Sequence, residues 1–202
     1  IYSMRTILTR LLLSSFYALF LATPLLLTKY NYELFEFNKM LFVYAITVVI
    51  ITVWLARSIL EGSLKIRRTV LDIPVLLFLA SQVVATVFSI DPHISIWGYY
   101  GRFNGGLLST LCYILLYYAA VSTLSKKQVI RLLAVSLFSG ALVAVYGVAQ
   151  RYGIDAHLWV QDVQNRIFST LGQPNWLAAY MAILTPIAIA FYLVVGNLKS
   201  VK

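Results

Sequence analysis

An arginine, a glycine and a Pro-Asn pair lie in order ahead of a long apolar stretch late in the sequence. Segment 166–186 reads RIFSTLGQPNWLAAYMAILTP. We expect Asn175 to cap a helix that begins here, because its side chain can accept a hydrogen bond from a first-turn amide. The free amides of that turn, the backbone freedom of Gly172 and the guanidinium of Arg166 all favour an anion. A serine and a threonine between them add hydroxyl donors. The pattern predicts a phosphate-binding site.

A second arginine lies in a similar setting earlier in the chain. Segment 89–106 reads SIDPHISIWGYYGRFNGG and contains Arg102 next to Gly101. Arginine suits phosphate because its planar fork donates paired hydrogen bonds and stays charged. We therefore expect Arg102 and Arg166 to bind the same kind of group. The alternative is that both side chains only reach out to the phosphates of ordinary membrane lipids.

Other reactive side chains are few and scattered. His93 and His157 are candidates for a general base, and solvation in a loop is the alternative for each. Asp155 and Asp162 could pair with Arg151 or Arg166, but two isolated carboxylates do not make a metal site, so we expect no metal. The single cysteine, Cys112, cannot form a disulfide within the chain. Nucleotide-binding, zinc-protease and serine-hydrolase motifs are missing from the sequence, so an enzyme here would need an activated substrate and no cofactor.

Composition places these residues in a membrane protein. The chain is 61% hydrophobic and 11% charged, whereas globular domains average about 25% charged residues. The net charge of +9 could suggest nucleic acid as a partner. The basic residues instead form short clusters between apolar runs, which is typical of a membrane topology signal. We therefore expect membrane lipids, and no nucleic acid, as partners.

Apolar runs predict an all-α bundle of about six transmembrane helices in one domain that covers residues 1–202. Pro24 and Pro186 fall inside predicted spans and should bend them. Small residues recur every fourth position at 136, 140 and 144, which favours close helix packing. The predicted spans are 11–28, 40–60, 73–90, 106–124, 129–150 and 176–195.

Charge counting orients these helices. If the N-terminus is inside, eleven basic residues are cytoplasmic: Arg5, Arg10, Arg57, Lys65, Arg67, Arg68, Lys126, Lys127, Arg131, Lys199 and Lys202. The other five are outside: Lys29, Lys39, Arg102, Arg151 and Arg166. The positive-inside rule then predicts that both termini are cytoplasmic and that the loops 29–39, 91–105 and 151–175 face outward.

The two arginine segments resemble the O-antigen ligase and polymerase superfamily of bacterial membrane glycosyltransferases. The likeness covers about residues 89–186 and rests on an arginine, a glycine and a Pro-Asn pair at the start of an alanine-rich helix. It implies a multi-pass protein of about twelve spans in the bacterial cytoplasmic membrane, of which this sequence is the N-terminal half. It also implies that Arg166, and less closely Arg102, binds the diphosphate of a carrier lipid.

The activity implied by the resemblance is glycan transfer. Members of the superfamily take a glycan from a polyprenyl diphosphate and pass it to lipid A core, a glycan or a protein hydroxyl on the outer face of the membrane. The resemblance places the family's catalytic histidine after Lys202, so we expect this segment alone to be inactive and its catalytic residues stay unassigned. The alternatives are a transporter or flippase of an anionic lipid-linked substrate, and a non-catalytic membrane subunit.

Overall fold

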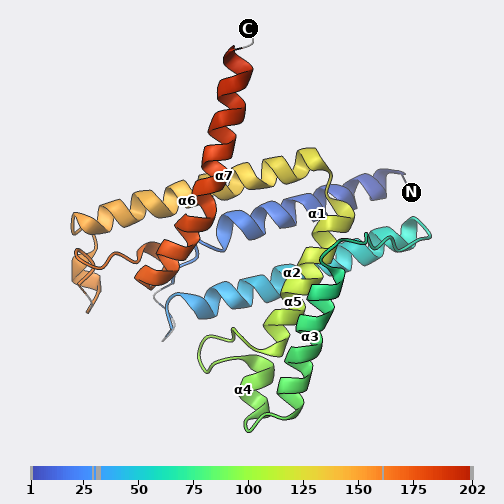
Figure 1. Ribbon diagram of the computed structural model, residues 1–202, viewed down its shortest axis with the longest axis horizontal. Helices are drawn as coiled ribbons and strands as arrows, with labels where there is room; N and C mark the ends of the chain where they lie inside the picture. Colours follow the sequence, from blue (N-terminus) through green and yellow to red (C-terminus); the bar gives the residue numbers. More distant parts are fainter. Residues whose placement is uncertain (1, 29, 31–32, 161, 201–202) are drawn as a thin grey trace.

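The computed structural model describes the backbone of residues 2–28, 30, 33–160 and 162–200, and the side chains of these between residues 3 and 194 (Figure 1). The described residues form helices and loops and contain no strand, as an all-α fold predicts. The elements are α1 (Tyr2–Ala22), α2 (Glu36–Leu60), α3 (Asp72–Val87), α4 (Pro92–Trp97), α5 (Leu107–Thr123), α6 (Lys126–Arg151), the 3-10 turns η1 (Ala156–Leu158) and η2 (Ser169–Leu171), and α7 (Pro174–Ser200).

Four of the described helices are long and apolar enough to cross a membrane, which supports the prediction of a membrane protein. They are Ser3–Ala22, Glu36–Leu60, Lys126–Arg151 and Pro174–Val194. The other two predicted spans correspond to α3 and α5, which are apolar helices of 16 and 17 residues. At 1.5 Å per residue they extend about 24–26 Å, slightly less than about 30 Å of hydrocarbon. The cytoplasmic location of the termini stays a prediction. Lys29 and Lys202, two charges in that count, lie outside the described residues.

The first helix differs from its predicted position. It begins near Tyr2 and ends at Ala22, so Pro24 lies in the turn that follows rather than inside the helix. The predicted bend at Pro24 was therefore wrong, because a proline ends a helix as readily as it bends one. The extra N-terminal turns include Arg5, whose Nε lies 2.9 Å from Glu61 Oε1, just after α2. Pro186 does lie inside α7, as predicted.

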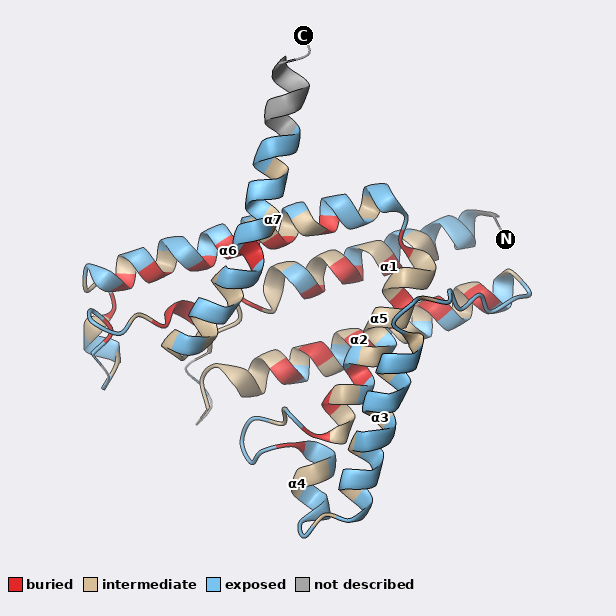
Figure 2. Ribbon diagram, in the orientation of Figure 1, coloured by how far each residue is buried: buried red, intermediate tan, exposed pale blue. Residues whose placement is uncertain are grey.

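The hydrophobic core lies where α1, α2, α5 and the start of α6 meet (Figure 2). Its members are apolar side chains that recur at helical spacing: Leu12, Phe16, Leu19, Val43, Ile50, Trp54, Ala119, Leu124 and Leu132. In contrast, α3 has no buried residue, and α7 projects beyond α6 (Figures 1 and 2). Gly140 explains how α7 packs on α6, because a Cβ at Gly140 would lie 2.2 Å from Leu184 Cδ1.

The two loops that contain Arg102 and Arg166 are joined to the region where α1 ends and α2 begins. In Figure 1 the turn between α1 and α2 lies at the same end as the α6–α7 loop. Hydrogen bonds join them directly, since Thr170 Oγ1 donates to the Pro24 carbonyl at 2.6 Å. The loop after α4 is joined to α2 as well, by the hydroxyl of Tyr44, which donates to the Phe103 carbonyl at 2.5 Å.

Candidate functional site

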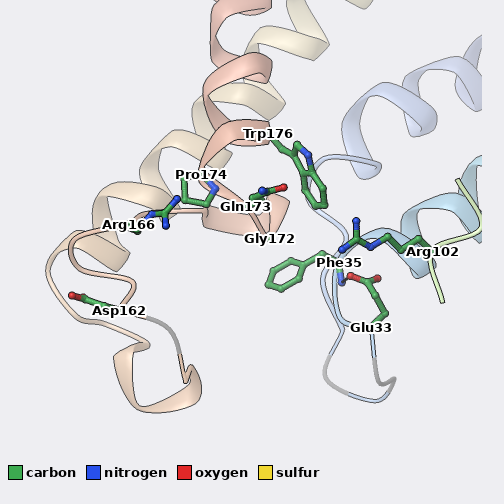
Figure 3. A pocket seen from close by; sticks show the side chains of 9 residues that line it. All are labelled: Glu33, Phe35, Arg102, Asp162, Arg166, Gly172, Gln173, Pro174 and Trp176. Atoms are coloured by element: carbon green, nitrogen blue, oxygen red, sulfur yellow. Dashed lines mark hydrogen bonds between the residues drawn. The ribbon is translucent and has the colours of Figure 1, made fainter. Parts of the chain in front are cut away.

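Arg102 and Arg166 line the same cavity, although 64 positions separate them in the sequence. The cavity has a volume of about 610 Å³. Figure 3 shows the two arginines on either side of it, with the start of α7 between them. The loops between α1 and α2, after α4, and between α6 and α7 all contribute to its walls. The lining residues are Glu33, Phe35, Arg102, Asp162, Arg166, Gly172, Gln173, Pro174 and Trp176.

A tight turn presents Arg102. The amide of Tyr99 donates to the Asn104 carbonyl at 3.2 Å, and the amide of Arg102 donates to the Tyr99 carbonyl at 3.1 Å. Glycines are needed where the two arms of this turn approach each other. Gly98 has a φ of +92°, and a Cβ there would lie 2.3 Å from the Asn104 carbonyl oxygen. Tyr113 of α5 also holds the turn through a 3.1 Å hydrogen bond to Asn104 Oδ1.

The Arg102 side chain has three partners. Its Nε lies 3.4 Å from Glu36 Oε2, and its Cζ lies 5.4 Å from the ring centroid of Trp176 and 5.5 Å from that of Tyr99. Contacts of a guanidinium with aromatic faces are attractive because the ring face is negative. The contact of Trp176 with Arg102 ties the start of α7 to the loop after α4. The Arg102 side chain remains 44% exposed and so accessible to a ligand.

Arg166 is placed by the acidic turn before it. Its amide donates to the Asp162 carbonyl at 3.0 Å, and the Asp162 carboxylate accepts from Asn165 Nδ2 at 2.6 Å. Hydrogen bonds from the Asn165 side chain and the Asn165 amide lower the pKa of Asp162, and the Gln164 amide lowers it to a smaller extent. The guanidinium of Arg166 is exposed and forms no ion pair with any residue that the structure describes. It is therefore a cation free to bind an anion.

The N-terminus of α7 differs from the prediction in which residue precedes the helix. The helix begins at Pro174, and the Leu177 amide donates to the Gln173 carbonyl at 3.1 Å. Asn175 thus lies inside the first turn, and the prediction that it caps the helix was wrong. The physical reason is that proline is favoured at the first helical position, where its missing N–H removes no hydrogen bond. Asn175 is exposed and is not among the residues that line the cavity.

Gly172 does line the cavity, and its role there is steric. It adopts a left-handed backbone with a φ of +83°, and a Cβ would lie 2.4 Å from Phe35 Cγ. The ring of Phe35 in turn stacks on Trp159 with centroids 5.4 Å apart and meets Phe168 edge-on at 5.6 Å. Gly172 therefore allows an aromatic cluster to form one wall of the cavity.

The serine and threonine of this loop serve the fold rather than an anion. Ser169 donates its hydroxyl to the Val143 carbonyl at 2.6 Å and its amide to Gln150 Oε1 at 2.7 Å. Thr170 donates its hydroxyl to the Pro24 carbonyl. Both residues are buried. The prediction that their hydroxyls face an anion was wrong, because a loop that packs into the protein must satisfy the backbone carbonyls that it meets.

The remaining candidates lie away from the cavity lining. His93 stacks on Tyr100 with ring centroids 5.6 Å apart, and His157 is exposed in η1. Neither lines the cavity. Arg151 donates to the Gln164 carbonyl at 2.5 Å, so it braces the loop. Among the described residues, no group of three or more histidine, cysteine or carboxylate side chains is placed to hold a metal ion.

Asp155 is a buried anchor for the α6–α7 loop. The prediction that it pairs with an arginine was wrong, since its Oδ2 accepts from Tyr146 at 2.5 Å, Gln150 at 3.0 Å and Trp159 Nε1 at 2.7 Å. Burial acts to raise the pKa of Asp155, but these three donors outweigh burial and the pKa is lowered. The carboxylate thus positions Trp159, which stacks on Phe35 at the cavity wall.

The first turn of α2 is part of the site that sequence reasoning missed. Phe35, just before the helix, lines the cavity, and Glu36 of this turn contacts Arg102. Lys39 Nζ donates to the Thr170 carbonyl at 2.5 Å. The sequence segment FEFNK placed an acid and a lysine three positions apart at the start of a helix, so that both lie on one face. That spacing was a usable signal, although it does not say which loops the two side chains reach.

Comparisons of the chain with protein-family models, with curated proteins and with solved structures found no match.

Proposed function

We propose that this cavity binds the diphosphate of a polyprenyl-diphosphate-linked glycan, and that the protein transfers the glycan to an acceptor hydroxyl on lipid A core, another glycan or a protein. One observation carries the proposal: Arg102 and Arg166, from separate loops, line one cavity of about 610 Å³. Arginine is the side chain best suited to phosphate oxygens. Two such cations across a cavity suit a ligand with two phosphates.

The carboxylates in the cavity do not oppose this reading. Glu33 accepts hydrogen bonds from the amides of Phe35 and Phe37 at 3.2 and 2.6 Å. Asp162 accepts from amides of its own turn, including that of Asn165 at 3.2 Å. Both carboxylates are thus engaged by backbone donors. They keep their negative charge, but their oxygens are held by the loop backbone, whereas Arg166 forms no ion pair with a described residue and Arg102 stays 44% exposed beside Glu36. Exposed guanidinium donors on both sides of the cavity support an anionic ligand.

The proposed reaction uses these cations on the leaving group. The acceptor oxygen bonds to the anomeric carbon of the donor sugar, the bond from that carbon to the phosphate oxygen breaks, and its electron pair leaves with the diphosphate. The proton of the acceptor hydroxyl passes to the departing diphosphate or to water. Negative charge grows on the diphosphate as the bond breaks, so fixed donors beside it stabilise the transition state. No metal or nucleotide is needed, because the donor is already activated.

Sequence features support the setting that we propose. The two segments that resemble O-antigen ligases and polymerases, 89–106 and 166–186, contribute both arginines to the cavity. The charge distribution favours cytoplasmic termini, which would place these loops on the outer face of a bacterial cytoplasmic membrane. The four long apolar helices are compatible with that location.

The test is transfer of a labelled glycan from its lipid carrier by the complete polypeptide in proteoliposomes. We expect product with the wild-type protein, a large loss of transfer with Arg166→Lys, and no loss with the charge-matched control Arg131→Lys, which changes an exposed residue of α6. Near-normal transfer by Arg166→Lys would remove Arg166 from the mechanism. Movement of the intact donor across the bilayer without transfer would support the alternative, a transporter of a lipid-linked anion.

A further inference from the structure

The first turn of α2 touches both loops that carry the arginines. Glu36 reaches Arg102, with Oε2 and Nε 3.4 Å apart, and Lys39 donates to the Thr170 carbonyl in η2. Side chains three positions apart share a helix face, so one face of a single turn reaches two loops. Phe35, just before the helix, packs against Gly172 in the second of these loops.

The contact between Glu36 and Arg102 orients the guanidinium. Glu36 approaches the Nε atom, so the two terminal nitrogens stay available for a ligand. The rings of Tyr99 and Trp176 approach the same group and limit its movement. The side chain of Glu36 is only 18% exposed, so solvent and salt screen this pair less than a pair on the open surface.

The contact between Lys39 and Thr170 places the other loop. Thr170 follows Arg166 by four positions and precedes Gly172 by two. Its hydroxyl donates to the Pro24 carbonyl and its carbonyl accepts from Lys39, so Thr170 is attached at two points. A shift of this attachment would move Arg166 and the start of α7 together.

We infer that the first turn of α2 is a positioning element. It sets where Arg102 lies relative to Arg166 and so prepares the two cations for one diphosphate. A prepared site binds more tightly because less ordering remains to be done when the ligand arrives. The inference rests on the proposed function. Glu36 and Lys39 act through the groups that they hold and do not themselves line the cavity.

The experiment measures binding of inorganic pyrophosphate to the complete protein in detergent micelles by titration calorimetry. We expect Glu36→Gln to weaken binding about fivefold, since residues in contact couple by about this amount. The same change made together with Arg102→Ala should add no further loss. Lys39→Met should weaken binding and Lys39→Arg should restore it, because arginine keeps the donor. Glu61→Gln, which breaks the ion pairs at the other end of α2, is the matched control and should change nothing.

Two results would overturn the inference and leave the proposed function standing. One is an unchanged dissociation constant for Glu36→Gln and Lys39→Met while Arg102→Ala weakens binding. The other is an equal loss from Glu36→Gln with and without Arg102, which would show a general effect on the fold. If Glu36→Gln does not fold, the comparison of Lys39→Met with Lys39→Arg decides. If Arg102→Ala and Arg166→Ala both bind pyrophosphate normally, the proposed function itself fails, and the inference with it.

Discussion

Replacing Gly172 with alanine tests how the cavity wall is built. The new methyl group would meet two obstacles. The backbone has a φ of +83°, and the Cβ would lie 2.4 Å from Cγ and 2.9 Å from Cβ of Phe35. Phe35 is itself packed against Trp159 and Phe168, so its ring has little room to retreat.

The magnitude follows from these two terms. A left-handed backbone costs about 1–2 kcal/mol for a residue with a Cβ. Forcing an extra methyl group into a packed site costs about 1–3 kcal/mol. We therefore expect Gly172→Ala to lower the free energy of unfolding by about 2–5 kcal/mol. Gly62 is the matched control, because it has a φ of +65° and no atom lies within 4 Å of the place that its methyl group would take, so alanine there should show the backbone term alone.

The assay is denaturant-induced unfolding of the complete protein in mild detergent, with each alanine variant made alone and in a Phe35→Ala background. Removing the ring should lower the cost of Gly172→Ala most of the way toward that of Gly62→Ala, because only the 2.9 Å approach to the Cβ of residue 35 remains, and it should leave the cost at Gly62 unchanged. Pyrophosphate binding should weaken with Gly172→Ala and not with Gly62→Ala. Equal costs at the two glycines, or no relief from Phe35→Ala, would refute the steric argument.

Three further predictions concern the arginine and the buried anchors. Arg166→Lys keeps the charge and loses the paired donors, so kcat for glycan transfer should fall about 10²–10³-fold, as for other oriented donors; an unchanged kcat would contradict this. The lowered pKa of Asp155 means that its carboxylate stabilises the fold above its unfolded pKa of about 3.9 and that this stability is lost as the pH falls through the folded value. Unfolding measured against pH should therefore show the wild-type protein losing its advantage over Asp155→Asn below about pH 4, whereas a constant gap would contradict the pairing. Ser169→Ala removes a buried hydrogen bond to the Val143 carbonyl and should cost about 0.5–1.5 kcal/mol in the same unfolding assay; no loss would show that the hydroxyl does not hold the loop.

Helix content was predictable from the sequence because hydrophobicity is a local property. All six predicted apolar segments contain an α-helix. Boundaries were harder, since they depend on distant partners. The extra turns of α1 include Arg5, which pairs with the distant Glu61, and α7 begins at Pro174, where the Gln173 carbonyl accepts from the Leu177 amide.

The arginines of the site were predictable from side-chain chemistry, and their supports were not. Nothing local in the sequence says that Lys39 bonds to Thr170, because 131 positions separate them. The same holds for Phe35 and Gly172, whose fit depends on the shape of the packed loops. The hydroxyls of the α6–α7 loop were assigned to an anion for a related reason: only the fold shows which carbonyls lie next to them.

The most direct measurement of the central claim is equilibrium binding of a polyprenyl diphosphate to the complete protein in lipid nanodiscs, with Arg102→Ala, Arg166→Ala and the control Arg131→Ala compared at one salt concentration. Hydrogen bonds to charged groups contribute about 1.5–3 kcal/mol, so each cavity variant should weaken binding about tenfold to a hundredfold and the control should not. Equal affinity for all three variants and the wild-type protein, or an equal loss in all three, would contradict a diphosphate site between Arg102 and Arg166.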